Sequence, residues 1–182
     1  MKTLSEHILD IVQNSIKANA KLIEIIVTED EKKNLCTLEI KDDGSGMDEK
    51  TLMLAANPFF TSRDTRKVGL GLSLLKQNAE NANGYFDIQS KKNKGTAVKA
   101  AFQLTHFDTP PLGDVWNTFY LTLLGNEKIE IVYRHKTCKG EFLIRSAEIK
   151  EMLGNVPIRQ KEIREAIIEM IKNNLKDITT IN

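Results

Sequence analysis

The sequence predicts an α+β protein, built from helices and from strands that are joined in hairpins. Apolar residues recur at helical spacing from Leu4 to about Ala18. Two pairs of short apolar or alternating runs, 22–29 with 36–42 and 85–91 with 96–104, are typical of strands. A second helical pattern lies between the two pairs, so helices and hairpins are both present in one chain, as an α+β fold requires.

The elements of the first half follow from local signals. The first helix is expected to begin after Thr3, because Thr3 and Glu6 have the spacing of a capping box. A short helix is expected at 48–56, and Pro58 ends it because proline lacks an amide hydrogen and restricts the residue before it. The next helix is expected at 69–84, where an Asn-Gly pair favours a helix end.

The chain changes character near Pro110 and Pro111, because neither residue continues a strand or a helix. We therefore expect residues 1–105 to form one domain and residues 106–182 to form a small α+β extension. The long helix expected from about Ile158 either packs on its own domain or forms the seam of a homodimer. The other elements expected in the extension are a helix at 112–124, hairpin strands at 129–135 and 141–146, and a short helix ending at Leu153.

Composition excludes several classes of protein. The 182 residues carry 26 Lys+Arg and 25 Asp+Glu, so the net charge of +1 provides no general field for nucleic acid or acidic membranes. Cys36 and Cys138 are far apart and lack metal-site spacing, which fits a reducing compartment, and Cys36 is expected to be inert core. There is no signal peptide and no apolar run of about 18 residues. We expect a cytoplasmic protein without a nucleic-acid or membrane partner.

The polar side of the first helix is the first candidate for a site. Asp10 and Asn14 lie one turn apart and away from the apolar stripe. Alone, such a pair is usually a solvated surface. Here four further motifs follow in order, and their joint spacing carries the functional prediction: Asp42-x-Gly44-x-Gly46, Pro58-Phe59-Phe60-Thr61, Val68-Gly69-Leu70-Gly71-Leu72 and Gly95-Thr96.

Residues 1–105 resemble the GHKL ATP-binding domain shared by histidine kinases, DNA gyrase, MutL proteins and related chaperones, and are most similar to sensor histidine kinase catalytic domains. NSIKANAKLIEIIV is similar to the N box, DDGSGM to the G1 box, PFFTSR to the F box, VGLGLSLL to the G2 box and GTAVKAAF to the last conserved strand. The resemblance implies a two-layer α/β sandwich, in which a mixed, mainly antiparallel sheet is covered by helices on one face. A Walker-type phosphate loop is absent from the sequence.

The resemblance implies that Asp42 accepts a hydrogen bond from the exocyclic amine of adenine. A carboxylate offers only acceptors, so it prefers this amine to the carbonyl oxygen of guanine, and such a bond is worth about 1.5 to 3 kcal/mol. Gly44 and Gly46 allow the backbone to approach the base without a Cβ. Thr96 is similar to the threonine that supports the same edge of adenine.

Phosphates are expected elsewhere in the same site. Gly69 and Gly71 are placed at a helix N-terminus, where free N–H groups and the helix dipole favour anions. The resemblance makes Asn14 the Mg²⁺ ligand and directs Lys17 at phosphate. Residues 61–68 correspond to the ATP lid, in which Arg63 either closes over the phosphates or stays in a solvated loop.

Asp10 marks a departure from the family pattern, because hydrolysing members carry glutamate four positions before the N-box asparagine. Aspartate is one methylene shorter, and a general base needs a reach of about 2.6 to 3.2 Å. Three roles stay open for Asp10: a direct base, a base acting through a second water, and a group that orients the metal shell.

Two functions compete. The first is a Mg-ATP-dependent protein kinase that acts in trans in signalling: the motifs begin close to Met1 and no histidine lies in an acceptor motif, so the phosphoacceptor is expected in another chain. His7 is expected to serve packing or to support a residue of the site, and His135 is placed at a hairpin end. The alternative is an ATP-driven conformational switch, or an ATPase, that binds a partner without phosphotransfer.

The predicted ligands are ATP and Mg²⁺, with Asp10 as the candidate catalytic residue and Asn14 as the metal ligand. The remaining predicted nucleotide-binding residues are Lys17, Asp42, Gly44, Gly46, Met47, Phe60, Thr61, Arg63, Gly69, Leu70, Gly71, Leu72 and Thr96.

Overall fold

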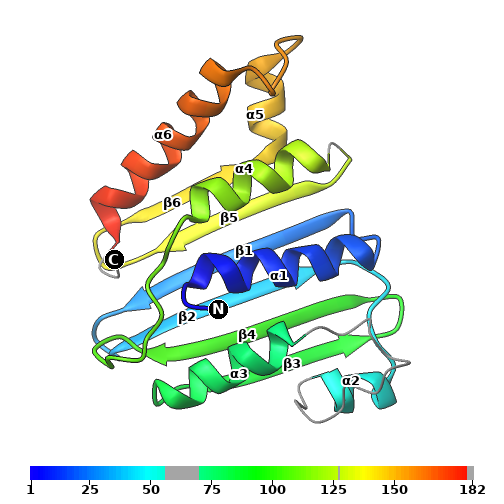
Figure 1. Cartoon of the computed structure of the whole chain (residues 1–182), viewed down its shortest axis with the longest axis vertical. Helices are drawn as coiled ribbons and strands as arrows, with labels where there is room; N and C mark the ends of the chain where they lie inside the picture. The colour runs from blue at the N-terminus through cyan, green and yellow to red at the C-terminus, as the bar shows by residue number, and fades with distance from the viewer. Residues whose placement is uncertain (56–69, 127, 180–182) are drawn as a thin grey trace.

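The structure, a computed structural model, describes residues 1–55, 70–126 and 128–179. Its helices and strands follow one another along the chain as shown in Figure 1. Their bounds are α1 Leu4–Lys17, β1 Leu22–Asp30, β2 Leu35–Asp42, α2 Glu49–Ala55, α3 Gly71–Asn81, β3 Tyr85–Lys91, β4 Gly95–Gln103, α4 Val115–Gly125, β5 Glu130–Lys136, β6 Glu141–Arg145, α5 Ser146–Leu153 and α6 Lys161–Ile178.

The six strands of the described residues belong to one sheet, in the order β3-β4-β2-β1-β5-β6. Strands β1 and β5 pair in parallel, and the other neighbouring pairs are antiparallel. The predicted mixed, mainly antiparallel sheet is therefore confirmed. It includes the hairpin that the sequence predicts between β1 and β2, with Ile25 opposite Ile40.

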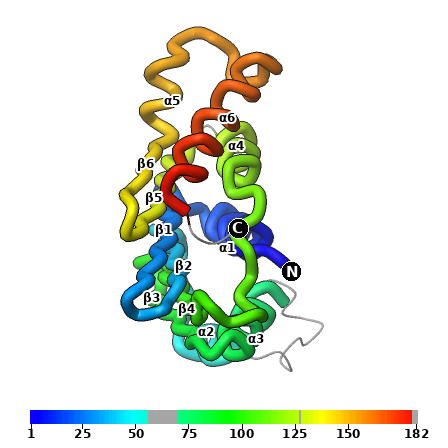
Figure 2. The backbone as a smooth tube through the Cα atoms, turned by 90° about the vertical axis from the view of Figure 1, so that its left-hand side faces the viewer, coloured from blue at the N-terminus to red at the C-terminus, as the bar shows by residue number. Residues whose placement is uncertain are grey.

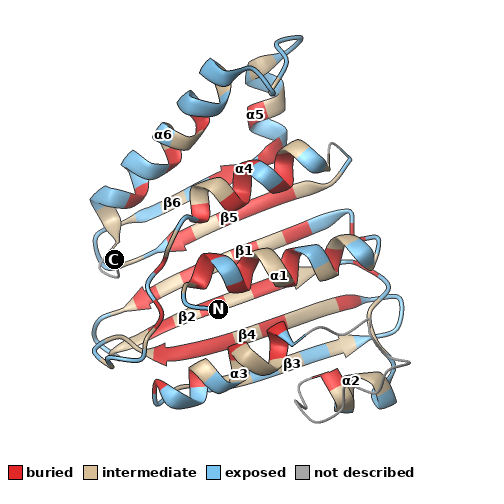
Figure 3. Cartoon of the chain, in the orientation of Figure 1, coloured by how far each residue is buried: buried red, intermediate tan, exposed pale blue. Residues whose placement is uncertain are grey.

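Helices α1, α3 and α4 cover one face of this sheet, as the edge-on view in Figure 2 shows. On β1 the side chains of Ile23, Ile25 and Val27 point to that face and are buried, whereas Glu24 and Ile26 on the other face are partly exposed. Alternation of this kind is expected of a strand with one covered face, and Figure 3 shows the buried residues gathered between the two layers. The predicted two-layer α+β sandwich is confirmed.

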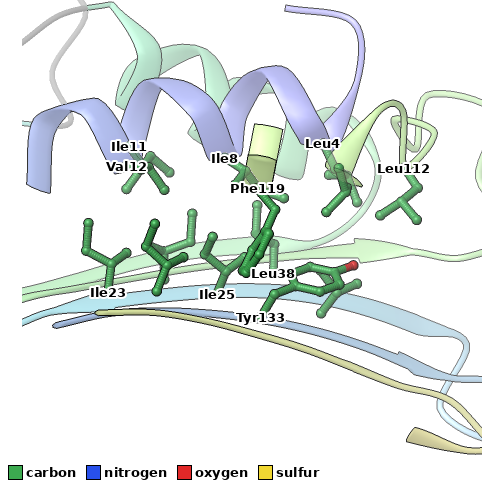
Figure 4. Close-up of a cluster of buried hydrophobic side chains, with 14 of the residues drawn as sticks. Leu4, Ile8, Ile11, Val12, Ile23, Ile25, Leu38, Leu112, Phe119 and Tyr133 are labelled. Atoms are coloured by element: carbon green, nitrogen blue, oxygen red, sulfur yellow. The ribbon is translucent and has the colours of Figure 1, made fainter. Parts of the chain in front are cut away.

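Helix α1 is fixed at its start by a cap and along its length by an apolar stripe. The Glu6 amide donates to Thr3 Oγ1 over 3.3 Å, and the Glu6 carboxylate accepts from the Lys2 amide over 2.6 Å. Leu4, Ile8 and Val12 have no exposed surface, and Figure 4 shows them pointing at the sheet residues Ile23, Ile25 and Leu38. Each fully buried side chain of this size contributes about 1.5 to 3 kcal/mol, so this stripe decides how the helix is rotated.

The second half of the chain continues the same sheet and the same core. Strand β5 pairs with the edge of β1 that faces away from β2, with Ile25 opposite Tyr133. Phe119 of α4 and Tyr133 of β5 pack in the same cluster as Ile8 and Ile25 (Figure 4). The boundary that the sequence predicts near residue 105 thus lies in a connection between two parts of one sheet.

A buried polar network joins β1 to β5. His135 Nε2 lies 2.7 Å from Glu29 Oε1, and His135 Nδ1 lies 2.8 Å from the Tyr133 hydroxyl. The side chains of Glu29 and His135 have no exposed surface. His135 is the last residue but one of β5, beside the turn to β6, so it lies at the hairpin end that the sequence predicts. Glu29 there supplies the partner that a buried polar group needs.

Two further predictions concern buried residues and the last helix. Burial raises the pKa of the Cys36 thiol to about 12, with a smaller contribution from the charge of Glu29, so Cys36 is inert core as predicted. Helix α6 buries Ile167, Ile171 and Leu175 and packs on α4 and β6, so its apolar stripe is used within its own chain. None of the described helices is both long and apolar enough to cross a membrane.

His7 joins α1 to α3 from a buried position. Its Nε2 accepts a hydrogen bond of 2.9 Å from Asn78 Nδ2, and its Nδ1 has no hydrogen-bond partner among the described residues. Burial lowers the pKa of His7 to about 4; the N-terminal charge adds to this effect and Glu6 opposes it. The packing role predicted for His7 is in keeping with this position.

We expect the free energy of unfolding to fall as the pH drops from about 6.5 to about 4. In this window the unfolded chain binds a proton at His7 that the folded chain does not, so stability is complete above the unfolded pKa and is lost towards the folded one. The loss should reach up to about 3 kcal/mol. Urea unfolding across this range should show a smaller pH dependence in His7→Gln, whereas His106→Gln should behave like the parent. An unchanged slope in His7→Gln would contradict the assignment.

Candidate nucleotide-binding site

Asp42, the last residue of β2, is held by two hydrogen bonds. Ser15 Oγ donates to Asp42 Oδ2 over 2.7 Å, and the Gly44 amide donates to Asp42 Oδ1 over 2.9 Å. Ser15 is buried at the sheet side of α1. Because each carboxylate oxygen can accept two hydrogen bonds, Asp42 keeps acceptor capacity for a ligand while its orientation is fixed by the protein.

The DxGxG loop after Asp42 closes onto the end of α1. The Ser45 amide donates to Ala18 O over 2.8 Å, and a Cβ on Gly44 would lie 2.9 Å from Ala18 Cβ. Gly46 has a φ of +60°, and a Cβ there would collide with the carbonyl of Lys91. Both positions require glycine. The side chains are excluded because the loop packs against Ala18 and Lys91. The sequence had led us to expect that they are excluded by the adenine ring.

Thr96 faces Asp42 across the β2–β4 pairing. A serine that the sequence analysis missed connects this side of the site: Ser90 Oγ lies 2.9 Å from Thr96 Oγ1 and donates to Gly95 O over 2.9 Å. The Met47 amide donates to Ser90 Oγ over 2.8 Å, so Met47 is tied to the site through its backbone. Its side chain packs against the core.

The polar pair on α1 lies beside the start of α3. Asn14 Nδ2 donates to Asp10 Oδ2 over 3.4 Å, which confirms that the two side chains stack one turn apart. A Cβ on Gly71, the first residue of α3, would overlap the Asp10 carboxylate. Asp10 therefore lies against the helix end whose free N–H groups and dipole favour negative charge, which is the end predicted to bind phosphate.

The other predicted residues are placed differently. Leu70, just before α3, is 57% exposed, whereas the Leu72 side chain belongs to the core, so only the Leu72 backbone is open to a ligand. Lys17 is exposed on the last turn of α1, three residues from Asn14, and forms no ion pair with a described residue. Phe60, Thr61, Arg63 and Gly69 lie outside the described residues.

The missed residues Ser15 and Ser90 share one property: each holds another part of the site. Ser15 follows Asn14 directly in the NSIKANA segment, so the sequence shows that it lies close to the predicted metal ligand. Its partner Asp42, however, is 27 residues away. Ser90 is an ordinary polar residue of β3. Only the pairing of β3 with β4 brings it next to Thr96.

The geometry agrees with the expected class of protein. An oriented carboxylate at the end of the central strand β2, and a helix that begins at Gly71 beside Asp10, are features that the resemblance to histidine kinase-like ATP-binding domains predicts. Residues 2–106 match the family described as "Histidine kinase-, DNA gyrase B-, and HSP90-like ATPase". The match covers more than half of the chain, and the chain belongs to this family.

Curated relatives match about half of the chain. The sensor histidine kinase YvrG of Bacillus subtilis is 33% identical over 98 residues, which are 52% of this chain and 17% of that protein. Sporulation kinase A of the same organism is 33% identical over 101 residues, which are 54% of this chain and 16% of that protein. The chain thus spans less than a fifth of the length of these relatives.

The solved structures extend the likeness of the fold. The crystal structure of the N-terminal domain of a DNA repair protein is similar with a TM-score of 0.56 and 20% identity, and the match covers 87% of this chain and 59% of that chain. At this identity the likeness shows the fold alone. Because 87% of the chain is more than its first 106 residues, the likeness includes part of the second half.

We expect Ser15→Ala to weaken ADP binding by about tenfold or more, because Asp42 loses a charge-assisted hydrogen bond worth about 1.5 to 3 kcal/mol and with it a fixed orientation. Calorimetric titration with ADP would measure the loss. Thr122→Val is the matched control, since it removes another buried helix hydroxyl, bonded to Thr118 O on α4. Equal affinity in Ser15→Ala and the parent would contradict the positioning role of Ser15.

Proposed function

We propose that this chain is a Mg-ATP-dependent protein kinase of the histidine kinase-like kind, which acts on a residue of another protein chain. The observation that carries the proposal is the convergence of Asp42, Asn14 and the start of α3 in the domain that matches known kinases. The end of the site near Asp42 suits the adenine ring, and the end near the start of α3 suits phosphate.

The choice of adenine over guanine would rest on Asp42. Its two oxygens already accept from Ser15 and the Gly44 amide, so the carboxylate can only offer further acceptor positions to a ligand. The exocyclic amine of adenine is a donor and satisfies such a position. The carbonyl oxygen of guanine would instead place two acceptors in contact.

The residues of the site fit a Mg²⁺ ion that is shared with the nucleotide. Asn14 donates through Nδ2 to Asp10, which leaves the Asn14 amide oxygen free to bind a cation. Within the described residues there is no cluster of three or more His, Cys, Asp or Glu side chains that could hold a metal alone. Mg²⁺ commonly takes one or two protein oxygens and completes its shell with phosphates and waters. When bound, the ion would neutralise phosphate charge.

The positions of the three histidines are in keeping with a phosphoacceptor outside these residues, which we propose to lie in another chain. His7 and His135 are fully buried. His106 follows the far end of β4, whereas Thr96 lies at its beginning. The seven residue steps from Thr96 to Gln103 span about 23 Å at about 3.3 Å per residue, so His106 lies at the other end of β4 from the proposed adenine contact.

A second candidate function, ATP hydrolysis linked to a conformational switch, is favoured by the position of Asp10. Its carboxylate lies between Asn14 and the first turn of α3, beside the predicted phosphates, where a base would activate water. The side chain of Asp10 is one methylene shorter than that of glutamate. It would therefore activate that water either directly or through a second water.

We expect ATP with Mg²⁺ to protect the protein against thermal unfolding far more than GTP with Mg²⁺. A ligand at 100 times its dissociation constant stabilises by about 2.7 kcal/mol, which is several degrees in a domain of this size. Differential scanning fluorimetry of the parent and of Asp42→Asn would measure the effect. Asparagine adds a donor, so the preference for ATP should shrink in this variant. Equal protection by both nucleotides in the parent would refute adenine selection by Asp42.

Transfer of labelled γ-phosphate separates the two functions. With a partner recovered by pull-down, the kinase proposal expects label on that partner, whereas the hydrolysis proposal expects steady phosphate release that is lost in Asp10→Asn while ADP affinity is kept. Absence of label from the chain and from every recovered partner would reject the kinase proposal. Unchanged phosphate release in Asp10→Asn would reject the base role.

A further inference from the structure

A groove of about 600 Å³ lies between the C-terminal ends of α1 and α4. The two helices run side by side, with these ends towards the same end of the sheet (Figure 1). Three segments far apart in the sequence line the groove. They are Ile16 with residues 19–21, residues 124–126 with 128 and 129, and Arg159 before α6. Glu127 lies outside the described residues.

The groove has an apolar floor and a basic rim. Ile16, Leu124 and Ile129 are half-buried in it. Three exposed cations, Lys21, Lys128 and Arg159, stand around them. Among the described residues that line the groove none is acidic. In a chain whose net charge is only +1, this is a local concentration of positive charge.

These cations are not needed to neutralise the two helix ends. At the end of α1 the carbonyls of Asn14, Ser15 and Ile16 accept from backbone amides of the following turn. At the end of α4 the carbonyl of Thr122 accepts from Asn126 Nδ2 over 3.1 Å. Orphan carbonyls at a helix C-terminus are what a capping cation would serve, and the carbonyls named here have other donors.

Two of the cations are also unpaired. Lys128 and Arg159 form no ion pair or side-chain hydrogen bond with any residue in the described part of the chain. Lys21 acts on Asp43, whose pKa is lowered chiefly by the hydrogen bond from the Leu22 amide and in small part by Lys21. The rim therefore holds positive charge that the described residues leave largely uncompensated.

We propose that this groove binds an acidic segment of a partner protein, with an apolar side chain of that segment on the floor and carboxylates against Lys21, Lys128 and Arg159. Charge complementarity selects this occupant. A small inorganic anion would leave the apolar floor exposed. Nucleic acid and acidic membranes require a broader positive field than the balanced composition provides.

The proposal goes beyond the nucleotide chemistry and does not rest on it. The turn at 18–22 separates the groove from the DxGxG loop: Ala18 O accepts from the Ser45 amide, and Asp43 Oδ1 accepts from the Lys21 and Leu22 amides over 2.7 and 2.9 Å. The partner segment would thus be held next to the nucleotide site on its outer side. Binding can be measured without nucleotide, so its failure leaves the kinase proposal untouched.

The test uses the whole chain and a fluorescein-labelled peptide in which glutamates flank two leucines, followed by fluorescence anisotropy at low salt. Saturable binding is expected, and Lys128→Glu with Arg159→Glu should weaken it by about tenfold or more. The matched control is Lys32→Glu with Lys136→Glu, which reverses the charge of two exposed lysines at the ends of β1 and β5 that lie away from the groove. It should leave the affinity for the peptide unchanged. Binding should also weaken at about 0.5 M salt, where charges are screened within a few ångströms.

Several outcomes would overturn the proposal. They are the absence of saturable binding, equal loss in both double variants, and equal binding of a peptide with lysines in place of the glutamates. Equal binding of a peptide with serines in place of the leucines would show that the apolar floor of the groove contributes nothing and that only the cations bind. Displacement of the peptide by millimolar inorganic phosphate would assign the groove to a small anion. An oligothymidylate that binds with the same dependence on Lys128 and Arg159 would assign it to nucleic acid.

Discussion

The rotation of α1 about its own axis is the constraint on which the rest of the structure depends. The helix must bury Leu4, Ile8 and Val12 against the sheet, and burying them leaves only one orientation for every other residue on it. Asp10 and Asn14 then face the start of α3. Ser15 comes down on the sheet side, one turn beyond Ile11, where a hydroxyl meets Asp42 at the end of the apolar stripe. The core and the nucleotide site are thus set by the same few side chains.

The second half of the chain completes the sheet on which α1 lies. Without α4 and β5 the strand β1 would be an edge, and Phe119 of α4 and Tyr133 of β5 would be missing from the core below α1. The Glu29–His135–Tyr133 network makes this pairing specific, because a shift of one residue in β5 would turn His135 to the other face and leave Glu29 buried without it. The extension is therefore part of the scaffold that positions the site.

Local signals explain why so much of the fold was predictable. The capping residue Thr3, the alternation in β1 and β2 and the proline pair at 110–111 each act over a few residues. The elements they predict lie close to the observed ones, although α4 begins at Val115 instead of 112 and α6 at Lys161 instead of Ile158. The parallel pairing of β1 with β5 could not be predicted in this way, because alternation fixes which face of a strand is buried but not which strand lies beside it. The partner of His135 could not be predicted for the same reason, because Glu29 is 106 residues away in the sequence.

The same distinction applies to the two sites at the end of α1. Asp42, Gly44, Gly46 and Thr96 belong to a spaced pattern and were visible in the sequence, whereas the basic groove draws single cations from three unrelated segments and has no pattern. Yet both sites depend on the last turn of α1, which presents Asn14 and Ser15 on one side and Ile16 on the other. A near-neutral protein cannot attract anions by its overall field. It can recognise them only where the fold gathers a few donors or cations, and this helix end does so twice.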